Sequence, residues 1–175
     1  MKHLSNSAVK TILNAFLLHN SGQIIRQTSN REVYRFMHKD KETYYIKLYY
    51  LPNNCLLKFT AYIKRILEYV HHKKLLDRGA PLPPLVGFDT ILYHSRKALV
   101  LVTKQIPRTI VLSEYISEHG LNYDSKILSS LALFLAKCYL EGFFHNDLHF
   151  GNILWIKDTD SFLFVDVAKI RFFRH

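Results

Sequence analysis

The stretch from Phe143 to Leu154 constrains this chain more than any other part of its sequence. It places a carboxylate at Asp147 and a carboxamide five positions later at Asn152, and a β-rich run then ends at a second carboxylate, Asp166. Mg²⁺ is a hard cation that prefers oxygen ligands and bridges protein side chains to phosphates. Phosphoryl transfer also requires a carboxylate near the acceptor hydroxyl, which positions the hydroxyl and accepts its proton. The spacing therefore predicts the ligands and the base of a phosphoryl-transfer loop.

Length and composition indicate a folded chain with an anionic partner. With 175 residues and a mass of 20.6 kDa, the chain is one domain, or one domain of two small lobes. Its hydrophobic share of 49% argues against disorder. The formal charge of +10, from 24 Lys and Arg against 14 Asp and Glu, indicates a nucleotide, a phosphorylated substrate, a nucleic acid or an acidic membrane surface as partner.

The cysteines and the N-terminus predict a cytoplasmic protein. Cys55 and Cys138 lie in apolar helical patterns and form no C-x-x-C pair, which predicts buried thiols in a reducing compartment. Residues 1–10 are too polar for a secretory signal. The sequence also has no run of about 18 apolar residues, the length that a spanning helix needs. Contact with a membrane surface stays open.

Hydrophobic periodicity predicts a mixture of helices and antiparallel strands. The first part is expected to contain a helix over 5–19 capped by Ser5 or Asn6, strands over 23–27, 32–38 and 43–50, and a long helix that includes Leu56 to Val70 and ends before Gly79. The second part is expected to begin with strands over 85–88, 91–93 and 98–103, with a hairpin turn over 94–97. A connector over 104–108 follows. Helices over 112–116 and 125–140 and a hairpin from Ile153 to Asp166 complete the chain's expected elements. The apolar run 128–136 predicts that the last helix lies at the centre of a core.

Two charged side chains stand out upstream of the loop. Lys47 lies in the apolar strand run 44–49, where a lone lysine ordinarily faces solvent. The downstream loop instead favours a phosphate-binding lysine on the third strand. Glu68 is an isolated acidic residue in a basic helix, which is consistent with a local ion pair to Lys64 or Arg65 or with a glutamate that orients Lys47.

The turn over 28–31 stands where a nucleotide-covering loop is expected, between the first two strands. It contains no glycine, so the close approach of its backbone to phosphates is harder than in a G-x-G-x-x-G loop. We expect Arg31 or the backbone N–H groups to compensate.

The chain from about residue 23 to 171 resembles the protein-kinase-like superfamily. The loop pattern H-x-D-L-H-x-G-N-I-L is shared with aminoglycoside- and choline-type phosphotransferases. Three further runs, 44–49, 75–83 and 165–171, resemble the lipopolysaccharide core kinases, which phosphorylate heptose or Kdo sugars of the inner core. The resemblance implies an α+β, protein-kinase-like two-lobe fold, with an N-terminal antiparallel sheet plus a long helix and a reduced helical C-lobe. We expect a single domain, with an N-lobe over 1–103 that carries an extra N-terminal helix, a hinge over 104–108 and a truncated C-lobe over 109–175.

The same resemblance implies roles for the candidate site residues. Lys47 corresponds to the lysine that binds the α- and β-phosphates of ATP, and Glu68 to the residue that orients it. Asp147 corresponds to the catalytic base. Asn152 and Asp166 correspond to the Mg²⁺ ligands.

Two histidines of the loop also have implied roles, and the sequence differs from the family pattern at two points. His145 is implied to brace the loop, whereas His149 either faces the transferred phosphoryl group or is a polar loop residue without a chemical role. Val167 and Ala168 stand where protein kinases carry Phe-Gly, and only nine residues follow Asp166. The acceptor is then bound by what remains of the C-lobe, or the chain is a minimal or degenerate member of the family.

These features predict an ATP- and Mg²⁺-dependent kinase whose substrate is an anionic glycolipid or a small molecule. A small-molecule phosphotransferase, a small Ser/Thr protein kinase and a non-catalytic kinase-like scaffold are the alternatives. Nucleic-acid binding is not expected, because it rests on charge alone. The excess of basic residues suits an anionic glycolipid or the inner face of the cytoplasmic membrane, or forms a solvated face. These residues are Lys64, Arg65, Lys73, Lys74, Arg78, Lys169, Arg171 and Arg174.

Overall fold

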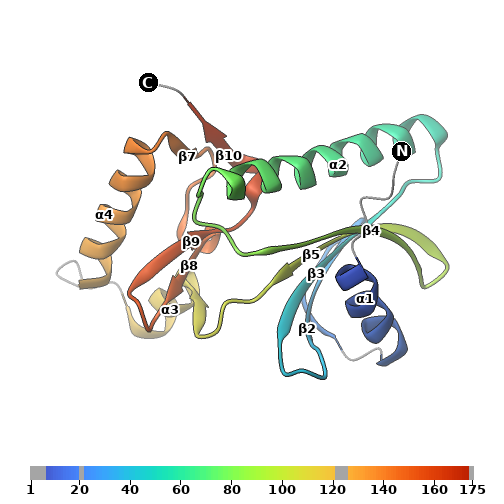
Figure 1. Cartoon of the computed structure of the whole chain (residues 1–175), viewed down its shortest axis with the longest axis horizontal. Helices are drawn as coiled ribbons and strands as arrows, with labels where there is room; N and C mark the ends of the chain where they lie inside the picture. The colour runs from blue at the N-terminus through green and yellow to red at the C-terminus, as the bar shows by residue number, and fades with distance from the viewer. Residues whose placement is uncertain (1–6, 20–21, 121–125, 174–175) are drawn as a thin grey trace. The chain divides into compact units, whose positions relative to one another are not determined.

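The computed structural model describes residues 7–19, 22–120 and 126–173 (Figure 1). The expected helix cap at Ser5 or Asn6 lies outside the described residues. Contacts divide the chain into two compact units. The first comprises Met1–Lys73 and Pro84–Gln105, and the second comprises Lys74–Pro83 and Ile106–His175.

The first unit is built on a five-stranded antiparallel sheet in the order β1-β2-β3-β5-β4. Its strands are β1 (Gln23–Gln27), β2 (Arg31–Met37), β3 (Thr43–Tyr50), β4 (Leu85–Tyr93) and β5 (Arg96–Lys104). The three expected N-terminal strands are confirmed. The division of β4 into two strands is wrong, because it runs unbroken to a tight turn at His94 and Ser95. Both turn residues have positive φ, 46° and 60°, as the favoured two-residue hairpin turn requires.

One face of this sheet is covered by α1 (Ser7–His19), which confirms the predicted N-terminal helix (Figure 1). Side chains alternate between the faces of a strand, so Ile46 and its even-numbered neighbours on β3 point to this helix. Phe16 of α1 is only 1% exposed. Its ring lies 5.1 Å from that of Tyr34 and 5.6 Å from that of Tyr93, measured between centroids.

The opposite face of the sheet packs against α2 (Cys55–Asp77), the expected long helix. Tyr49 and Leu101 of the sheet form a small core with Tyr62 and Ile66 of the helix. The odd-numbered residues of β3, which include Lys47, therefore lie on the α2 side of the sheet.

The second unit contains two small antiparallel sheets and two α-helices, α3 (Leu112–His119) and α4 (Lys126–Leu140), within the described residues. One sheet has the order β6-β8-β9, with β6 (Thr109–Val111), β8 (Ile153–Ile156) and β9 (Ser161–Phe164). The other sheet pairs β7 (Phe143–His145) with β10 (Ile170–Phe172). Short 3₁₀ turns occupy η1 (Phe150–Asn152) and η2 (Val167–Lys169). The sequence did not predict β6, β7 or β10, because three residues are too few for a periodic signal.

Residues 74–83 join the second unit, whereas the sequence analysis included them in the N-lobe. Leu75, Ala80 and Leu82 are buried in the core of the second unit. The backbone N–H of Phe164 also donates to the carbonyl of Pro81 at 2.9 Å. The segment after α2 is therefore part of the support of β9.

The predicted central position of α4 is wrong for much of its surface. Leu131 and Cys138 are buried, but Leu133 and Leu140 are 73% and 74% exposed. Apolar periodicity shows which side chains can be buried, not whether another element covers them. One face of α4 packs on the core of the second unit, and much of the rest stays exposed in the described structure.

The two cysteines differ from each other. Cys138 is buried as expected, and burial raises the pKa of its thiol to about 12. The predicted burial of Cys55 is wrong, because this residue is exposed at the start of α2. Both thiols are free.

Asp160 links the β8–β9 turn to α4. Its carboxylate accepts hydrogen bonds from the Ser130 hydroxyl at 2.8 Å and from the Trp155 indole N–H at 3.0 Å. The Ser130 bond is the largest cause of a lowered pKa at Asp160, and it outweighs the opposing effect of burial. Ionised Asp160 therefore stabilises the fold.

We expect Asp160→Asn to lower the free energy of unfolding by about 1 kcal/mol at neutral pH, because a charged acceptor makes the stronger hydrogen bonds. The folded pKa is lowered, so this contribution is present above the ordinary pKa of 3.8 and is lost as the pH falls through the folded value. Urea unfolding at neutral pH and at about pH 2 should show the difference shrink. Asp158→Asn, in the same turn, is the control and should cost less, because its pair with Arg108 is exposed. Equal losses in the two variants would contradict the assigned role.

Candidate functional site

The loop between β7 and η1 is braced by His145, a buried residue. Its Nδ1 accepts the backbone N–H of Asp147 at 3.2 Å. Its Nε2 lies 2.9 Å from the carbonyl oxygen of Val165. Because Nδ1 accepts, Nε2 carries the proton and donates to Val165. His145 thus joins the loop to the segment before Asp166, which agrees with the bracing role that the family resemblance implied.

Asn152 joins the other end of the loop to the same segment. Its side-chain Nδ2 donates to the carbonyl oxygen of Asp147 at 2.9 Å. The backbone N–H of Val165 donates to the carbonyl of Asn152, also at 2.9 Å. Asp166 is the next residue in the chain. The structure therefore joins Asp147, Asn152 and Val165 by hydrogen bonds, and Asp166 follows Val165 directly.

Asp166 has a left-handed backbone conformation, with φ and ψ both at 57°. Aspartate tolerates this region better than most residues, although it is sparsely populated outside glycine. Strained conformations of this kind cluster at functional sites, where the surrounding structure maintains them. Here η2 and β10 follow at once, and the backbone N–H of Asn146 donates to the carbonyl of Lys169 at 3.0 Å.

His149 has a local structural role. It is exposed, and its Nδ1 accepts the backbone N–H of Gly151 at 3.1 Å, which caps η1. A Cβ atom at position 151 would lie 3.0 Å from the His149 ring, so the glycine permits this close approach. The alternative role of His149, contact with a transferred phosphoryl group, stays a prediction.

The first unit holds the other candidate residues. Glu68 is 7% exposed and accepts hydrogen bonds from the Tyr49 hydroxyl at 2.9 Å and from Arg65 at 2.7 Å. Burial, followed by the charge of Glu68, raises the pKa of Tyr49. Lys47 lies two residues from Tyr49 on the same strand and on the same face of the sheet. The structure thus shows the local pair of Glu68 with Arg65, and places Glu68 beside the face that carries Lys47.

Arg31 begins β2 directly across from Tyr49 of β3. It therefore lies on the same face as Lys47, which pairs with Val33 on the same two strands. The turn before it is closed, since the backbone N–H of Thr28 donates to the carbonyl of Arg31 at 2.8 Å. This N–H is engaged within the turn. Phosphate binding by Arg31 stays a prediction.

Sequence reasoning missed a polar contact at the start of the connector. Arg35 of β2 donates from Nε to the Gln105 side-chain oxygen at 3.1 Å. The backbone N–H of Gln105 donates to the carbonyl of Thr43 at 2.8 Å. The two contacts hold the first residues after β5 against the sheet. No local pattern could reveal them, because they join residues far apart in the sequence.

The described residues contain no cluster of three or more His, Cys, Asp or Glu side chains that could hold a metal ion. This finding does not conflict with the predicted Mg²⁺ ligands. Mg²⁺ commonly binds through one or two protein groups and completes its shell with water and substrate phosphates. The predicted pair also includes a carboxamide, Asn152.

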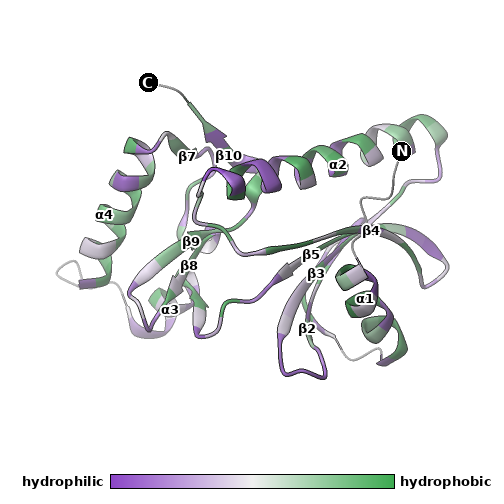
Figure 2. Ribbon diagram, in the orientation of Figure 1, coloured by the Kyte–Doolittle hydropathy of each residue, from purple (hydrophilic) through white to green (hydrophobic). Residues whose placement is uncertain are grey.

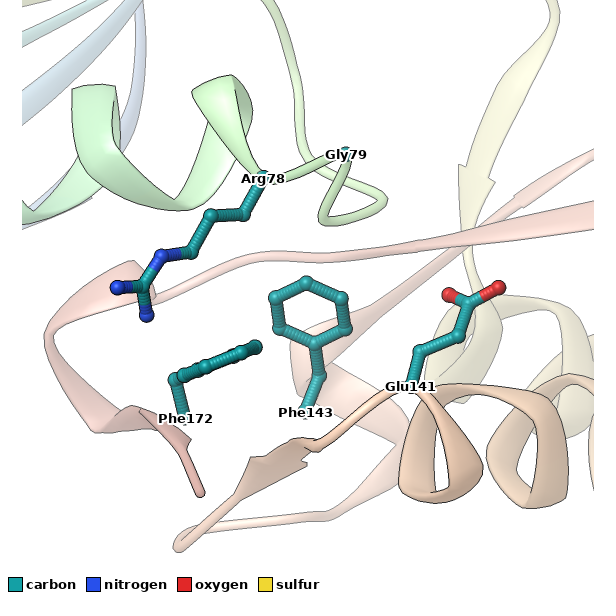
Figure 3. A pocket seen from close by; sticks show the side chains of 5 residues that line it. All are labelled: Arg78, Gly79, Glu141, Phe143 and Phe172. Atoms are coloured by element: carbon teal, nitrogen blue, oxygen red, sulfur yellow. The ribbon is translucent and has the colours of Figure 1, made fainter. Parts of the chain in front are cut away.

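Two pockets lie within the second unit. One, of about 570 Å³, is lined by Arg78, Gly79, Glu141, Phe143 and Phe172 (Figure 3). The Arg78 guanidinium lies 4.1 Å from the centre of the Phe172 ring, a cation–π contact. The other pocket, of about 590 Å³, borders the loop through His145 and Leu148 and is otherwise lined mainly by apolar side chains of α4, β7 and β9.

Comparison with solved structures identifies the fold. A structure of WaaP in complex with acyl carrier protein matches with a TM-score of 0.60 over 94% of this chain and 66% of that chain, at 16% sequence identity. The chain has a protein-kinase-like fold. A 2.2 Å crystal structure of WbdD matches with a TM-score of 0.57 over 87% of this chain and 33% of that chain, at 20% identity. Another structure, described as the bifunctional kinase-methyltransferase WbdD, has a TM-score of 0.56 and covers 83% and 31%, also at 20% identity.

The structural match and the observed elements confirm the predicted α+β class, the N-terminal antiparallel sheet with its long helix and the short C-terminal part. This chain spans 66% of WaaP and about a third of WbdD. No protein-family model and no curated protein matches the sequence. In the part of the chain that the structure describes, no helix has both the length and the apolar character needed to cross a membrane.

Proposed function

We propose that this chain is an ATP- and Mg²⁺-dependent kinase that transfers the γ-phosphoryl group to a sugar hydroxyl of a lipopolysaccharide inner core. The arrangement that carries the proposal is the hydrogen-bonded link of Asp147, Asn152 and Val165, with Asp166 next in the chain. It offers one carboxylate for the acceptor hydroxyl and two oxygen ligands for a metal. The kinase-like fold supports this assignment. The candidate residues also follow one another along the sequence in the order that kinases use.

Asp147 is the proposed base. Its carboxylate accepts the proton of the acceptor hydroxyl while the hydroxyl oxygen bonds to the γ-phosphorus and the bond from phosphorus to the bridging oxygen breaks, releasing ADP. The backbone of Asp147 is fixed at its N–H by His145 and at its carbonyl by Asn152. Catalysis of phosphoryl transfer depends strongly on such positioning.

Asn152 and Asp166 fit a site for Mg²⁺. The Nδ2 of Asn152 is engaged by Asp147, which leaves its side-chain oxygen for another partner. Asp166 follows Val165, whose N–H bonds to the backbone of Asn152. A Mg²⁺ ion held by Asn152 and Asp166 would supply positive charge that stabilises the negative charge of the transferred phosphoryl group.

In the first unit, we assign nucleotide binding to Lys47, Glu68 and Arg31. Lys47 and Arg31 place two cations on one face of the sheet, a suitable arrangement for the phosphates of ATP. Glu68 lies against this face through Tyr49 and is proposed to orient Lys47. In this proposal Arg31 donates hydrogen bonds to the phosphates, a role that the backbone N–H groups of a glycine-rich loop have in other nucleotide-binding proteins.

The acceptor is inferred from the motifs. The runs 44–49, 75–83 and 165–171 resemble lipopolysaccharide core kinases, which favours a glycolipid acceptor at the inner face of the cytoplasmic membrane. A second candidate function, a non-catalytic nucleotide-binding scaffold, is favoured by the closed, glycine-free turn before Arg31.

The proposal is tested by transfer of label from γ-labelled ATP. We expect labelling of de-phosphorylated core glycolipid in the presence of Mg²⁺ and no labelling when Mg²⁺ is chelated. An aminoglycoside, choline and a protein substrate are tested in parallel as alternative acceptors. If one of these alternative acceptors is labelled and the glycolipid is not, the proposed acceptor changes from a core sugar to the class of the labelled molecule. Equal background labelling by the wild-type protein and the Asp147→Asn variant on every acceptor would contradict kinase activity. Nucleotide binding without turnover would instead support the non-catalytic nucleotide-binding scaffold.

Arg31→Gln is expected to raise the KM for ATP about tenfold with little change in kcat, because the phosphate contact is made in both the ground state and the transition state. Steady-state kinetics with varied ATP measures both constants. Arg96→Gln is the matched control, since the Arg96 guanidinium lies 3.9 Å from the centre of the Tyr50 ring on the α1 face of the sheet. A lower kcat at unchanged KM would instead assign Arg31 to the chemical step.

A further inference from the structure

An exposed apolar stripe runs along α2, next to the face that packs on the sheet. Leu56, Phe59, Ile63 and Leu67 recur at three- and four-residue steps and are 72%, 63%, 40% and 60% exposed. On the helix surface they adjoin Tyr62 and Ile66, which pack against the sheet, because residues three or four positions apart are neighbours. Their exposed fractions show that the sheet does not cover them. These four residues are called the α2 stripe. Figure 2 shows hydrophobic colouring along the first part of α2 and hydrophilic colouring near its end.

The exposure of this stripe is unusual for a helix that already has a packed face. Single exposed apolar residues are ordinary, but a continuous group of large ones marks an interaction surface. From Leu56 to Leu67 the stripe covers about three turns, or roughly 16 Å along the helix axis. A surface of this length suits a partner that is itself extended and apolar.

The charges around the stripe are almost all positive. Lys58, Lys64, Lys73 and Lys74 are exposed on the same helix. Glu68 is buried and engaged by Tyr49 and Arg65, so it does not offset them at the surface. The partner should therefore combine an apolar layer with negative charge.

We propose that the α2 stripe binds the surface of an anionic lipid bilayer, with its apolar side chains among the acyl chains and the flanking lysines at the lipid phosphates. A helix with Leu, Phe and Ile on one side and lysines beside them lies in the plane of the membrane interface. Each lysine near an anionic surface strengthens this attraction. The lysine stems can extend along the apolar surface and place their charges at the headgroups.

A second copy of this chain fits the stripe less well. In a two-fold symmetric dimer the same patch meets itself, so Lys58 and Lys64 of each copy would face a similarly basic surface. An apolar protein partner would leave the lysines without a counter-charge. The bilayer satisfies both the apolar and the charged part of the surface. The proposal does not depend on catalysis, because it is tested without nucleotide or acceptor.

Co-sedimentation of the full chain with vesicles measures the predicted binding. We expect binding to vesicles of phosphatidylcholine with about one quarter phosphatidylglycerol, and at least tenfold weaker binding to phosphatidylcholine alone. Salt of about 0.5 M should weaken binding to the anionic vesicles, since it screens the lysines. Failure of the wild-type protein to bind the anionic vesicles would overturn the proposal.

Two variants separate the apolar and the charged contributions. Leu56→Gln with Leu67→Gln should weaken binding to the anionic vesicles at least tenfold. Lys58→Gln with Lys64→Gln should also weaken it at least tenfold, at about fivefold per lysine. Leu92→Gln is the matched control, because Leu92 on β4 is 71% exposed, almost the same as Leu56, and it should bind as the wild type does. Circular dichroism of each variant checks that it remains folded.

The outcomes distinguish the possible partners. Binding that is lost in both stripe variants and retained in Leu92→Gln supports the proposal. Unchanged binding in the stripe variants would assign membrane contact to another surface and overturn it. A dimer that is seen without lipid and is broken by Leu56→Gln with Leu67→Gln would show that a second copy covers the stripe, which would also overturn it.

Discussion

A protein with Asp147→Asn should bind MgATP as the wild type does, yet transfer the γ-phosphoryl group about a thousand times more slowly. The structural bonds of Asp147 are made by its backbone, whose N–H bonds to His145 and whose carbonyl bonds to Asn152. Asparagine keeps these bonds and nearly the same volume, so the loop should keep its shape. It cannot accept the acceptor proton at this position, and the loss should therefore fall on kcat. Single-turnover transfer and calorimetric titration with MgATP measure the two quantities.

The exposed Asp158 in the β8–β9 turn provides a matched control for this change. Its carboxylate pairs with Arg108 at 2.8 Å, and both side chains are largely exposed. Asp158→Asn should therefore leave kcat within about twofold of the wild type. If Asp147→Asn kept more than about a tenth of the wild-type kcat, Asp147 would not be the base.

The loop was predictable because its determinants are local. His145, Asp147 and Asn152 lie within eight consecutive residues and bond to one another directly. A spacing pattern can therefore carry almost the whole arrangement. The hairpin predicted from Ile153 to Asp166 accounts for the bond between Val165 and Asn152, because a hairpin brings the ends of two neighbouring strands together.

Contacts between distant elements were less accessible from the sequence. The sequence left Glu68 with two readings, a local pair with Arg65 or an orienting role for Lys47. The structure adds Tyr49, which reaches Glu68 from β3 across nineteen residues of sequence. This contact depends on how α2 lies on the sheet, and periodicity gives the inner side of a helix without giving its position along the strands.

Glu32 is a structural residue that sequence reasoning missed. It is 8% exposed on β2, where an acidic residue would ordinarily face solvent. Burial alone would raise its pKa, but hydroxyl donors from Tyr50 at 2.6 Å and Tyr34 at 2.9 Å outweigh burial and lower it. Tyr34 lies two residues from Glu32 on the same strand, whereas the approach of Tyr50 from β3 follows from strand register, which the sequence does not give.

Asp166→Asn should lower the affinity for MgATP at least about tenfold and kcat about a hundredfold or more, while affinity for metal-free ATP stays unchanged. Asparagine is accepted in the left-handed region as readily as aspartate, so the backbone at φ 57° should persist. What is removed is the negative charge that would hold Mg²⁺ beside Asn152. Titrations of ATP with Mg²⁺ and with a chelator separate the two affinities.

Asp160 provides the matched control for Asp166, because it is also a left-handed aspartate, with φ 48°, in the β8–β9 turn. Its carboxylate is engaged by Ser130 and Trp155, which assigns it to folding and not to metal binding. Asp160→Asn should therefore reduce stability without changing the dependence of ATP affinity on Mg²⁺. Equal loss of MgATP and metal-free ATP affinity in Asp166→Asn would show instead that Asp166 shapes the nucleotide site through its backbone. The contrast between two aspartates with the same unusual conformation thus separates the metal-binding role from the structural one.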